Sequence, residues 1–290
     1  MGRLNTLCRN GLVSALILIA GCLATAHTST SEPGESIRKA AKLNARAMKY
    51  HERRCLDDAS ALYRKILALD PPVEPSPDQF AAVLRYAPRL YTVAGEFFPL
   101  ADVAAIVHPD KPVIGYHLFW GDDIDYPDDN DPIDHEVVWI EYDPATEAVV
   151  RVSTYFHEDI LQGDAAVRDA NANSGRAWIG VEWGKHGSLP WDAAGIKSGQ
   201  PNQELRKNWE ILHTKGTRAP DHPLARGWPQ RFVGGFDAYR AFSVLVDPSH
   251  LLNAKHMIKV GRWANAILDQ HFLPYNFSPK QEWPWRGLPF

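Results

Sequence analysis

VIGYHLFW, residues 113–120, is a run of β-branched, aromatic and other apolar side chains around one histidine. Such a run is typical of a β-strand. Three further segments share its character, and Gly, Pro, Asn and Asp are frequent between them: residues 136–142, 148–156 and 177–183. Strands in succession, separated by turn residues rather than by helical patterns, predict an antiparallel β-sheet or β-sandwich. We therefore expect a mainly β core over residues 86–248.

Helical patterns precede this core. Between residues 36 and 69 apolar side chains recur every three or four positions, and a Pro-Pro pair at 71–72 ends the pattern. The segment Ser76–Gln79 reads S-P-D-Q, which is a capping box with proline at the first helical position. It predicts a short helix to about Tyr86. Residues 36–85 are therefore expected to form an N-terminal helical region.

The sequence after the core is less regular. Residues 187–234 are polar and contain many Pro, Gly and Trp residues, which predicts irregular surface structure. A helical pattern then runs from Ser249 to Phe272. The remaining tail carries Trp283 and Trp285, and we expect it to pack back on the sheet as an extended strap. Residues 249–290 thus form a C-terminal helix and an aromatic tail.

The first residues have the pattern of an export signal. Residues 1–21 contain two arginines, no acid and a short apolar run, whereas a membrane-spanning helix needs roughly 20 apolar residues. Ile-Ala-Gly-Cys at 19–22 resembles a bacterial lipobox, so Cys22 is the expected lipidation site and residues 22–35 the tether. We expect a cell-envelope protein held at a membrane, periplasmic or on the outer surface. Cleavage after Ala26 would instead give a secreted soluble form.

Composition limits the class of protein. The 290 residues are 45% hydrophobic and 23% charged, as in soluble globular proteins, and the formal net charge is -4. This excludes a polytopic membrane protein and argues against a nucleic-acid partner, which normally meets a basic surface. Of the three cysteines, only Cys55 lies outside the leader and lipobox. A single cysteine cannot form an intramolecular disulfide, so core packing must hold the fold together.

An acidic loop is the first candidate site. Gly121–Glu136 contains eight acidic residues and neither lysine nor arginine. Carboxylate oxygens are ligands that Ca²⁺ prefers, although the spacing is not that of an EF-hand. The alternative is a solvated acidic loop stiffened by its two prolines.

Histidines form the second candidate. One occurs in or beside each predicted strand: His117, His135, His157 and His186. Imidazoles and a carboxylate on one face would bind Zn²⁺ or Mn²⁺. Strand alternation, however, places His135 and Glu136 on opposite faces. Structural, hydrogen-bonded histidines are the alternative interpretation, and there is no G-x-S-x-G motif for a nucleophilic serine.

Three stretches, covering about residues 86–190, resemble a known family. They are Tyr86-Ala87-Pro88 with Glu96–Pro99, then Tyr116–Trp120 with Asp134–Trp139 (D-H-E-V-V-W), then Trp178–Pro190. The pattern is similar to that of the Vps62-like family, named for a vacuolar sorting protein, and more distantly to the necrosis-inducing, NPP1-like proteins. The resemblance implies a β-sandwich and, in the second group, a divalent metal near a G-H-R-H-D-W-E motif. In this sequence Val138 and Ile140 replace two carboxylates of that motif.

These observations give three functional hypotheses. The first is a lipid-anchored, non-catalytic module that binds a small polar or glycan ligand, with a divalent cation (Ca²⁺, or Mn²⁺ or Zn²⁺) as an optional component. The second is a metal-dependent hydrolase of the cell envelope, and the third a structural envelope protein with a protein partner. No catalytic residue is assigned. The candidate metal ligands are Asp123, Asp125, Asp134, His135, Glu136, Glu141 and His186.

Overall fold

The computed structural model describes residues 33–124, 133–190, 200–216, 222–253, 257–272 and 277–285. The expected signal peptide, Cys22 and nearly all of the tether lie outside the described residues. So do Asp125 and most of the acidic loop.

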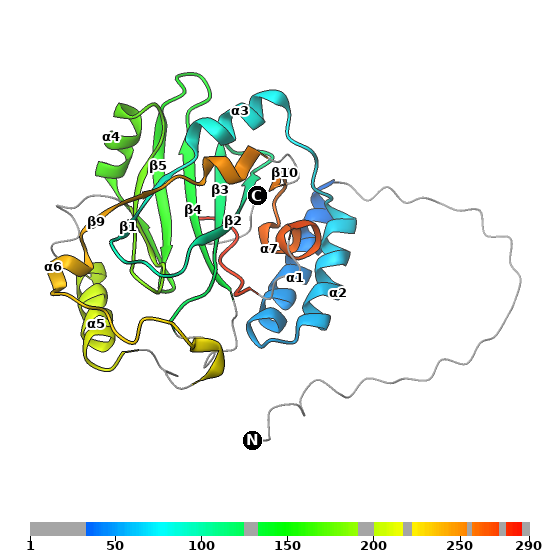
Figure 1. The fold of residues 1–290 in the computed structure, drawn as a ribbon. Helices are drawn as coiled ribbons and strands as arrows, with labels where there is room; N and C mark the ends of the chain where they lie inside the picture. Colours follow the sequence, from blue (N-terminus) through cyan, green and yellow to red (C-terminus); the bar gives the residue numbers. More distant parts are fainter. Residues whose placement is uncertain are drawn as a thin grey trace, which may run out of the picture.

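Two β-sheets form the centre of the molecule (Figure 1). The larger sheet has the strand order β10-β2-β3-β4-β5-β6, with strands Ile258–Val260, Leu100–Val107, Val113–Trp120, Asp134–Tyr142, Val149–Phe156 and Asp159–Gln162. The smaller has the order β8-β7-β1-β9, with strands Ser188–Pro190, Trp178–Val181, Arg89–Val93 and Phe242–Val246. One apolar cluster contains residues of both sheets, so the sheets pack on a shared core.

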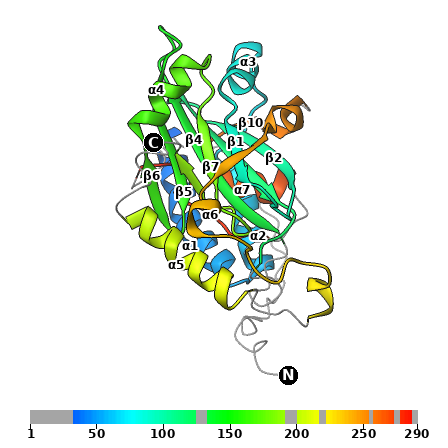
Figure 2. The same cartoon turned by 60° about the vertical axis from the view of Figure 1, so that its left-hand side comes forward.

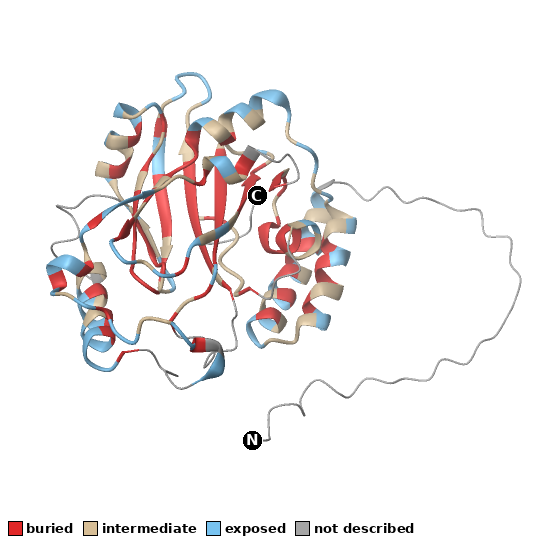
Figure 3. Cartoon of the chain, in the orientation of Figure 1, coloured by how far each residue is buried: buried red, intermediate tan, exposed pale blue. Residues whose placement is uncertain are grey.

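The position of β3 explains why VIGYHLFW is apolar on both faces. It lies between β2 and β4 in the larger sheet, and all eight of its residues are buried (Figure 3). Ile114, Tyr116 and Leu118 face the core shared with the smaller sheet. Val113 and Phe119 belong to clusters with the C-terminal segments on the other face. A strand covered on both faces loses the alternation of a half-exposed strand.

Helices cover that other face. Helices α1 (Pro33–Glu52) and α2 (Leu56–Leu69) pack on each other and on Trp263 beside the short α7 (Ala264–Ile267). Ala264 and Ile267 of α7 in turn contact Trp139 of the sheet. Figure 1 shows these three helices together on one side. The expected helical pattern is interrupted at Arg54, which has φ 60°.

Several expectations are confirmed. The capping box forms at Ser76 and Gln79, and α3 runs from Pro77 to Tyr86. Strands occupy the four predicted segments, with bounds within two residues of those expected. The aromatic strap also packs as expected: Trp283 is 2% exposed, lies against Trp139, and donates a 2.7 Å hydrogen bond from Nε1 to the Arg262 carbonyl.

The expected mainly β, antiparallel class needs correction. The fold is mixed α/β, and each sheet contains a parallel pair, β1 with β7 and β10 with β2. The region expected to be irregular contains α5, Gln200–Thr214, beside the short α6, Phe236–Tyr239 (Figure 2). Helix α4, Asp164–Ala172, packs on β5 and β7.

The single C-terminal helix predicted over 249–272 is wrong. The segment contains a 3-10 helix (Pro248–Asn253), strand β10, α7 and a π-helical turn (Leu268–Phe272). Backbone pairing with the edge of β2 outweighs the helical pattern here. Gly261 permits the close approach of the Ile267 side chain after β10, because a Cβ there would lie 2.6 Å from Ile267 Cδ1. Within the described part of the chain, no helix is long and apolar enough to cross a membrane.

Candidate functional site

The turn between β7 and β8 supplies two side chains that organise one end of the sheets, Glu182 and His186. Backbone hydrogen bonds hold the turn closed, from Glu182 N to the Gly187 carbonyl (3.1 Å) and from His186 N to the Glu182 carbonyl (3.0 Å). Both side chains are fully buried. Glu182 pairs with a histidine and His186 pairs with carboxylates, but the surroundings of these two histidine–carboxylate clusters differ.

Glu182 pairs with His157, which lies in the two-residue turn between β5 and β6. Phe156 pairs with Asp159 across this turn, and both turn residues are left-handed, with φ 45° at His157 and 73° at Glu158. Two-residue hairpin turns of this kind favour Asn and Gly, which adopt positive φ readily. Other residues there cost of order 1–3 kcal/mol each. The sequence thus keeps a histidine at a strained position.

Glu182 fixes the orientation of the His157 ring. Its Oε2 lies 2.6 Å from His157 Nε2, while its Oε1 accepts hydrogen bonds from Asn208 Nδ2 and Tyr239 OH, both at 2.9 Å. Burial alone would lower the pKa of His157, but the hydrogen bond and charge of Glu182 outweigh burial and raise it. Because Nε2 donates to Glu182, the neutral ring carries its lone pair on Nδ1. Nδ1 is therefore the atom that can accept a proton or, once protonated, donate a hydrogen bond.

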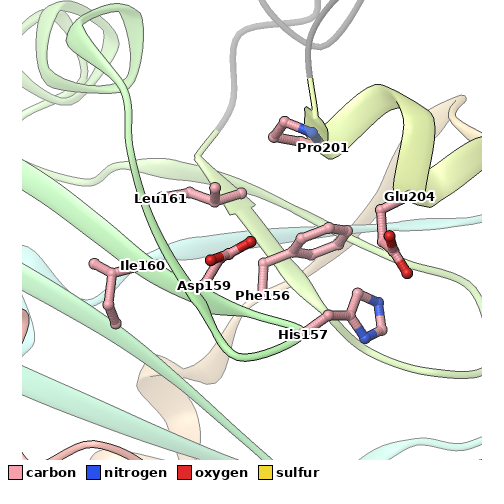
Figure 4. Close-up of a pocket in the computed structure, with 7 residues that line it drawn as sticks. All are labelled: Phe156, His157, Asp159, Ile160, Leu161, Pro201 and Glu204. Atoms are coloured by element: carbon pink, nitrogen blue, oxygen red, sulfur yellow. The ribbon is translucent and has the colours of Figure 1, made fainter.

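A pocket of about 280 Å³ opens beside this histidine (Figure 4). The turn and strand β6 form one wall, and the first turns of α5 form the other. Its lining combines apolar and polar side chains: Phe156, His157, Asp159, Ile160, Leu161, Pro201 and Glu204. On α5, Pro201, Glu204 and Asn208 follow the spacing of one helical face, so the helix presents all three toward the turn.

His186 occupies the second surroundings, which are fully buried. Its Nδ1 lies 2.8 Å from Asp134 Oδ2 and its Nε2 3.4 Å from Glu96 Oε1, and its ring stacks on Trp120 at 4.4 Å. Burial lowers its pKa, but Glu96 and Asp134 overcome this and raise the pKa to about 10. His186 is thus a buried imidazolium between two carboxylates.

Three backbone amides donate hydrogen bonds to the Glu96 carboxylate. Its Oε1 accepts from Phe97 N and Phe98 N, at 2.8 and 3.1 Å, and its Oε2 accepts from Gly184 N at 2.8 Å. Burial acts to raise the pKa of Glu96, but His186 and these amides lower it. The cluster joins the β1–β2 loop, the start of β4 and the β7–β8 turn.

His135 lies away from both pairs, on the helical face of the sheet. Its Nδ1 donates to the Ser278 carbonyl (2.8 Å), so its Nε2 accepts from His117 Nδ1 (3.0 Å). Burial lowers the pKa of His117 to about 3 and that of His135 well below its usual value, so both rings are neutral. The alternation expected for β4 is confirmed: His135 lies opposite Phe119 of the helix-side cluster, whereas Glu136 lies opposite Leu118 of the shared core.

The other candidate ligands are also dispersed. Glu136 is buried beside Lys280, with Oε1 3.4 Å from Nζ, and burial raises its pKa. Glu141 pairs with Arg151 at 3.4 Å, and Asp123 lies half-buried at the start of the acidic loop. Of the predicted ligands that the structure describes, Asp134 and His186 are the pair in direct contact. In the described ranges no group of three or more His, Cys, Asp or Glu could hold a metal ion.

Sequence reasoning missed most residues of the His157 pocket. Asp159, Glu182, Glu204 and Asn208 are not among the candidates predicted from the sequence, and Glu204 and Asn208 lie on α5, a helix not expected from the sequence. A signal was available: Leu205, Trp209 and Leu212 follow the i, i+4, i+7 spacing of an amphipathic helix. Leu205 and Leu212 are indeed buried.

Comparisons with known proteins give little further information. No protein-family model and no curated protein matches the sequence. Among solved structures, the crystal structure of a mutant of NLPPya, a necrosis-inducing-like protein, is similar with a TM-score of 0.30 and 14% sequence identity. The similarity covers 56% of this chain and 95% of that one. An overlap this weak assigns neither a family nor an activity.

Proposed function

We propose that this chain is a lipid-anchored, extracytoplasmic protein of a bacterial envelope that binds a small polar ligand, of the size of a glycan unit, between the β5–β6 turn and α5. The observation that carries the proposal is the composition of the 280 Å³ pocket. This volume is just below the usual range of about 300–1,000 Å³ for ligand pockets, which favours a small ligand.

The two kinds of lining suit a hydroxylated ring. Leu161 and Pro201, which are partly exposed, offer apolar surface to the C–H faces of a sugar. The carboxylates of Asp159 and Glu204 accept hydrogen bonds from hydroxyl groups, and a protonated His157 donates one from Nδ1. Asn208 and Tyr239 are committed to Glu182 and hold the site from behind.

Ligand-observed NMR with a panel of monosaccharides tests this proposal on the full-length chain in detergent. Glu204→Gln and Asp159→Asn should each weaken binding by about tenfold. Glu210→Gln, on the exposed side of the same helix, is the matched control and should bind like wild type. Equal binding by all variants, or no binding by the wild type, contradicts the proposal.

The membrane anchor and the cation belong to the same proposal and need separate tests. Cys22→Ser should abolish labelling with a radioactive fatty acid, whereas Cys8→Ser should not. A divalent cation at the acidic loop should appear in mass spectrometry of protein purified without chelator, and EDTA should then lower the melting temperature. An unlabelled wild type contradicts the anchor, and an absence of metal contradicts the cation.

A second candidate function is hydrolysis, because His157 and Glu182 form a histidine–carboxylate pair at the edge of the pocket. In this arrangement Nδ1 of neutral His157 would accept a proton from water. Hydrolysis of a model sugar ester that falls at least about a hundredfold in His157→Gln, while His222→Gln stays active, would support it. Turnover unaffected by His157→Gln would exclude this pair as its source.

A further inference from the structure

We infer that one face of helix α1 binds the surface of a membrane that contains anionic phospholipids. This surface contact goes beyond ligand binding in the His157 pocket, and it rests on the proposed lipid anchor for the distance between α1 and the bilayer. It follows from the charge, the exposure and the place in the chain of α1.

Helix α1 has two distinct faces. Its inner face packs in the cluster with α2 and Trp263, and its buried residues recur at helical spacing: Ala40, Asn44, Ala47 and His51. Its outer face carries five exposed cations, which we call the basic stripe: Lys39, Lys42, Arg46, Lys49 and Arg53. Steps of three and four residues place these five side chains on one side of the helix, along about 21 Å.

Acidic side chains do not neutralise the basic stripe. Among the residues that the structure describes, none of the five cations takes part in an ion pair. The exposed acidic residues of α1, Glu35 and Glu52, lie in its first turn and at its last residue. Each cation of the stripe thus has a like charge three or four positions away, which destabilises an isolated helix. A face that is merely solvated usually mixes both signs, so a stripe of one sign indicates an anionic partner.

The charge of this region is opposite to that of the whole chain. Residues 33–69, which form α1 and α2, contain nine lysines and arginines and four acidic residues. The complete sequence contains 31 basic and 35 acidic residues. The acidic excess therefore lies outside the two helices. A molecule that meets an anionic surface through α1 turns its basic region toward that surface and most of its acidic residues away from it.

The place of α1 in the chain keeps the stripe near the bilayer. Ten residues, 23–32, separate the expected lipidation site Cys22 from the first residue of α1, Pro33. A segment of that length spans at most about 36 Å when fully extended, and about 16–19 Å as a flexible coil. Close to an anionic leaflet, each lysine or arginine gains electrostatic attraction.

The packing of α1 favours contact with the surface over insertion. Its apolar residues are enclosed in the cluster with α2, so the helix has no free apolar face to bury among acyl chains. Figure 1 shows α5 on the other side of the molecule from α1. Binding through the stripe would therefore leave the His157 pocket, one wall of which is α5, facing away from the membrane.

Acetylation of lysine side chains, followed by mass spectrometry, tests the inference on the full-length chain in vesicles. Vesicles of phosphatidylcholine alone are compared with vesicles that contain about 30% phosphatidylglycerol, at about 0.05 M salt. Lys39, Lys42 and Lys49 should react at least about threefold more slowly with the anionic vesicles, whereas Lys215, which follows α5, should react equally in both. About 1 M salt should abolish the difference, because it shortens the Debye length to about 3 Å.

A matched pair of double variants tests whether the stripe itself makes the contact. Lys42→Gln/Arg46→Gln should weaken the surface contact by about thirtyfold, so that Lys39 and Lys49 lose their protection. Arg226→Gln/Arg231→Gln removes two exposed cations elsewhere and should leave the protection unchanged. Glutamine is a good helix former, and melting curves verify that each variant folds. The comparison of vesicles with the wild type needs no variant.

The outcomes separate the stripe from the anchor. Equal acetylation rates in the two kinds of vesicle overturn the inference, and so does an equal slowing of Lys215. Stronger protection of the stripe by soluble heparin than by anionic vesicles also overturns it, in favour of an anionic polysaccharide. Flotation with phosphatidylcholine vesicles tests the anchor: a chain that does not float contradicts the anchor, while protection by anionic vesicles would still support the stripe.

Discussion

His186 and His157 lie at the same end of the molecule and are both paired with carboxylates, yet their surroundings differ. His186 is fully buried, with a carboxylate at each ring nitrogen and an indole against its face. His157 is 26% exposed, has one nitrogen committed to Glu182, and lines a pocket. Residue type and partner type are thus insufficient to identify a functional histidine. The free face and the adjoining volume distinguish the two.

Removal of the His186 charge should give the largest change in stability, and it tests this comparison most directly. His186→Gln leaves Glu96 and Asp134 without their cation, and breaking a buried ion pair costs about 3–5 kcal/mol. The free energy of unfolding in urea should fall by this amount. Glu210→Gln, at an exposed position, is the control and should change stability by less than about 0.5 kcal/mol. A loss below about 1 kcal/mol for His186→Gln would mean that this cluster is not structural.

The pH dependence of stability gives the next largest effect. The pKa of His186 is raised from 6.5 to about 10, so its stabilisation is fully present below about pH 6.5 and is lost as the pH rises through 10. Stability should therefore decline between about pH 7 and 10, and less steeply in His186→Gln. NMR of the His186 ring should show a proton retained across most of this range. A ring that loses its proton near pH 7 would contradict the assignment.

A smaller effect is expected at the other pair. Glu182→Gln replaces the charged acceptor of three side-chain donors and should cost about 2 kcal/mol. It should also lower the pKa of His157 below its ordinary value, since burial then acts without the opposing charge. NMR titration of the His157 ring measures this, with Glu210→Gln as control. An unchanged pKa would show that Glu182 does not hold the ring in solution.

The smallest expected effect comes from a substitution that relieves backbone strain in the β5–β6 turn and leaves the His157 pocket in place. Glu158 is exposed with φ 73°, and glycine adopts this conformation readily. Glu158→Gly should raise the free energy of unfolding by about 0.5–1 kcal/mol and leave ligand binding intact. Glu210→Gly, within helix α5, should instead lower stability by about 1 kcal/mol. A destabilised Glu158→Gly protein would show that the turn is unstrained.

The sequence predicts local structure here better than it predicts the site. The capping box at Ser76 and the apolar run of β3 depend on neighbouring residues, and both are confirmed. Strand alternation also correctly separates His135 from Glu136. The C-terminal helix fails because β10 gains its hydrogen bonds from β2, a partner about 150 residues away in the chain.

The site itself depends on contacts that no local pattern contains. Glu182 meets His157, Asn208 and Tyr239 from three different segments. The family resemblance instead suggests a metal near Asp134 and His135. The side chains of these two residues, however, point to opposite faces of β4. A sequence motif gives the order of the residues, but the geometry of the sheet determines which of their side chains lie on the same face.

The aromatic strap has a consequence for how the chain matures. Asn44, near the beginning of the folded part, donates to Glu282, 238 positions later, and His135 depends on the Ser278 carbonyl. These two contacts cannot form until the last segment has arrived, and contacts of such long sequence separation form slowly. A chain that is exported unfolded would benefit from this delay, because its final structure would form only after the C-terminus has crossed the membrane.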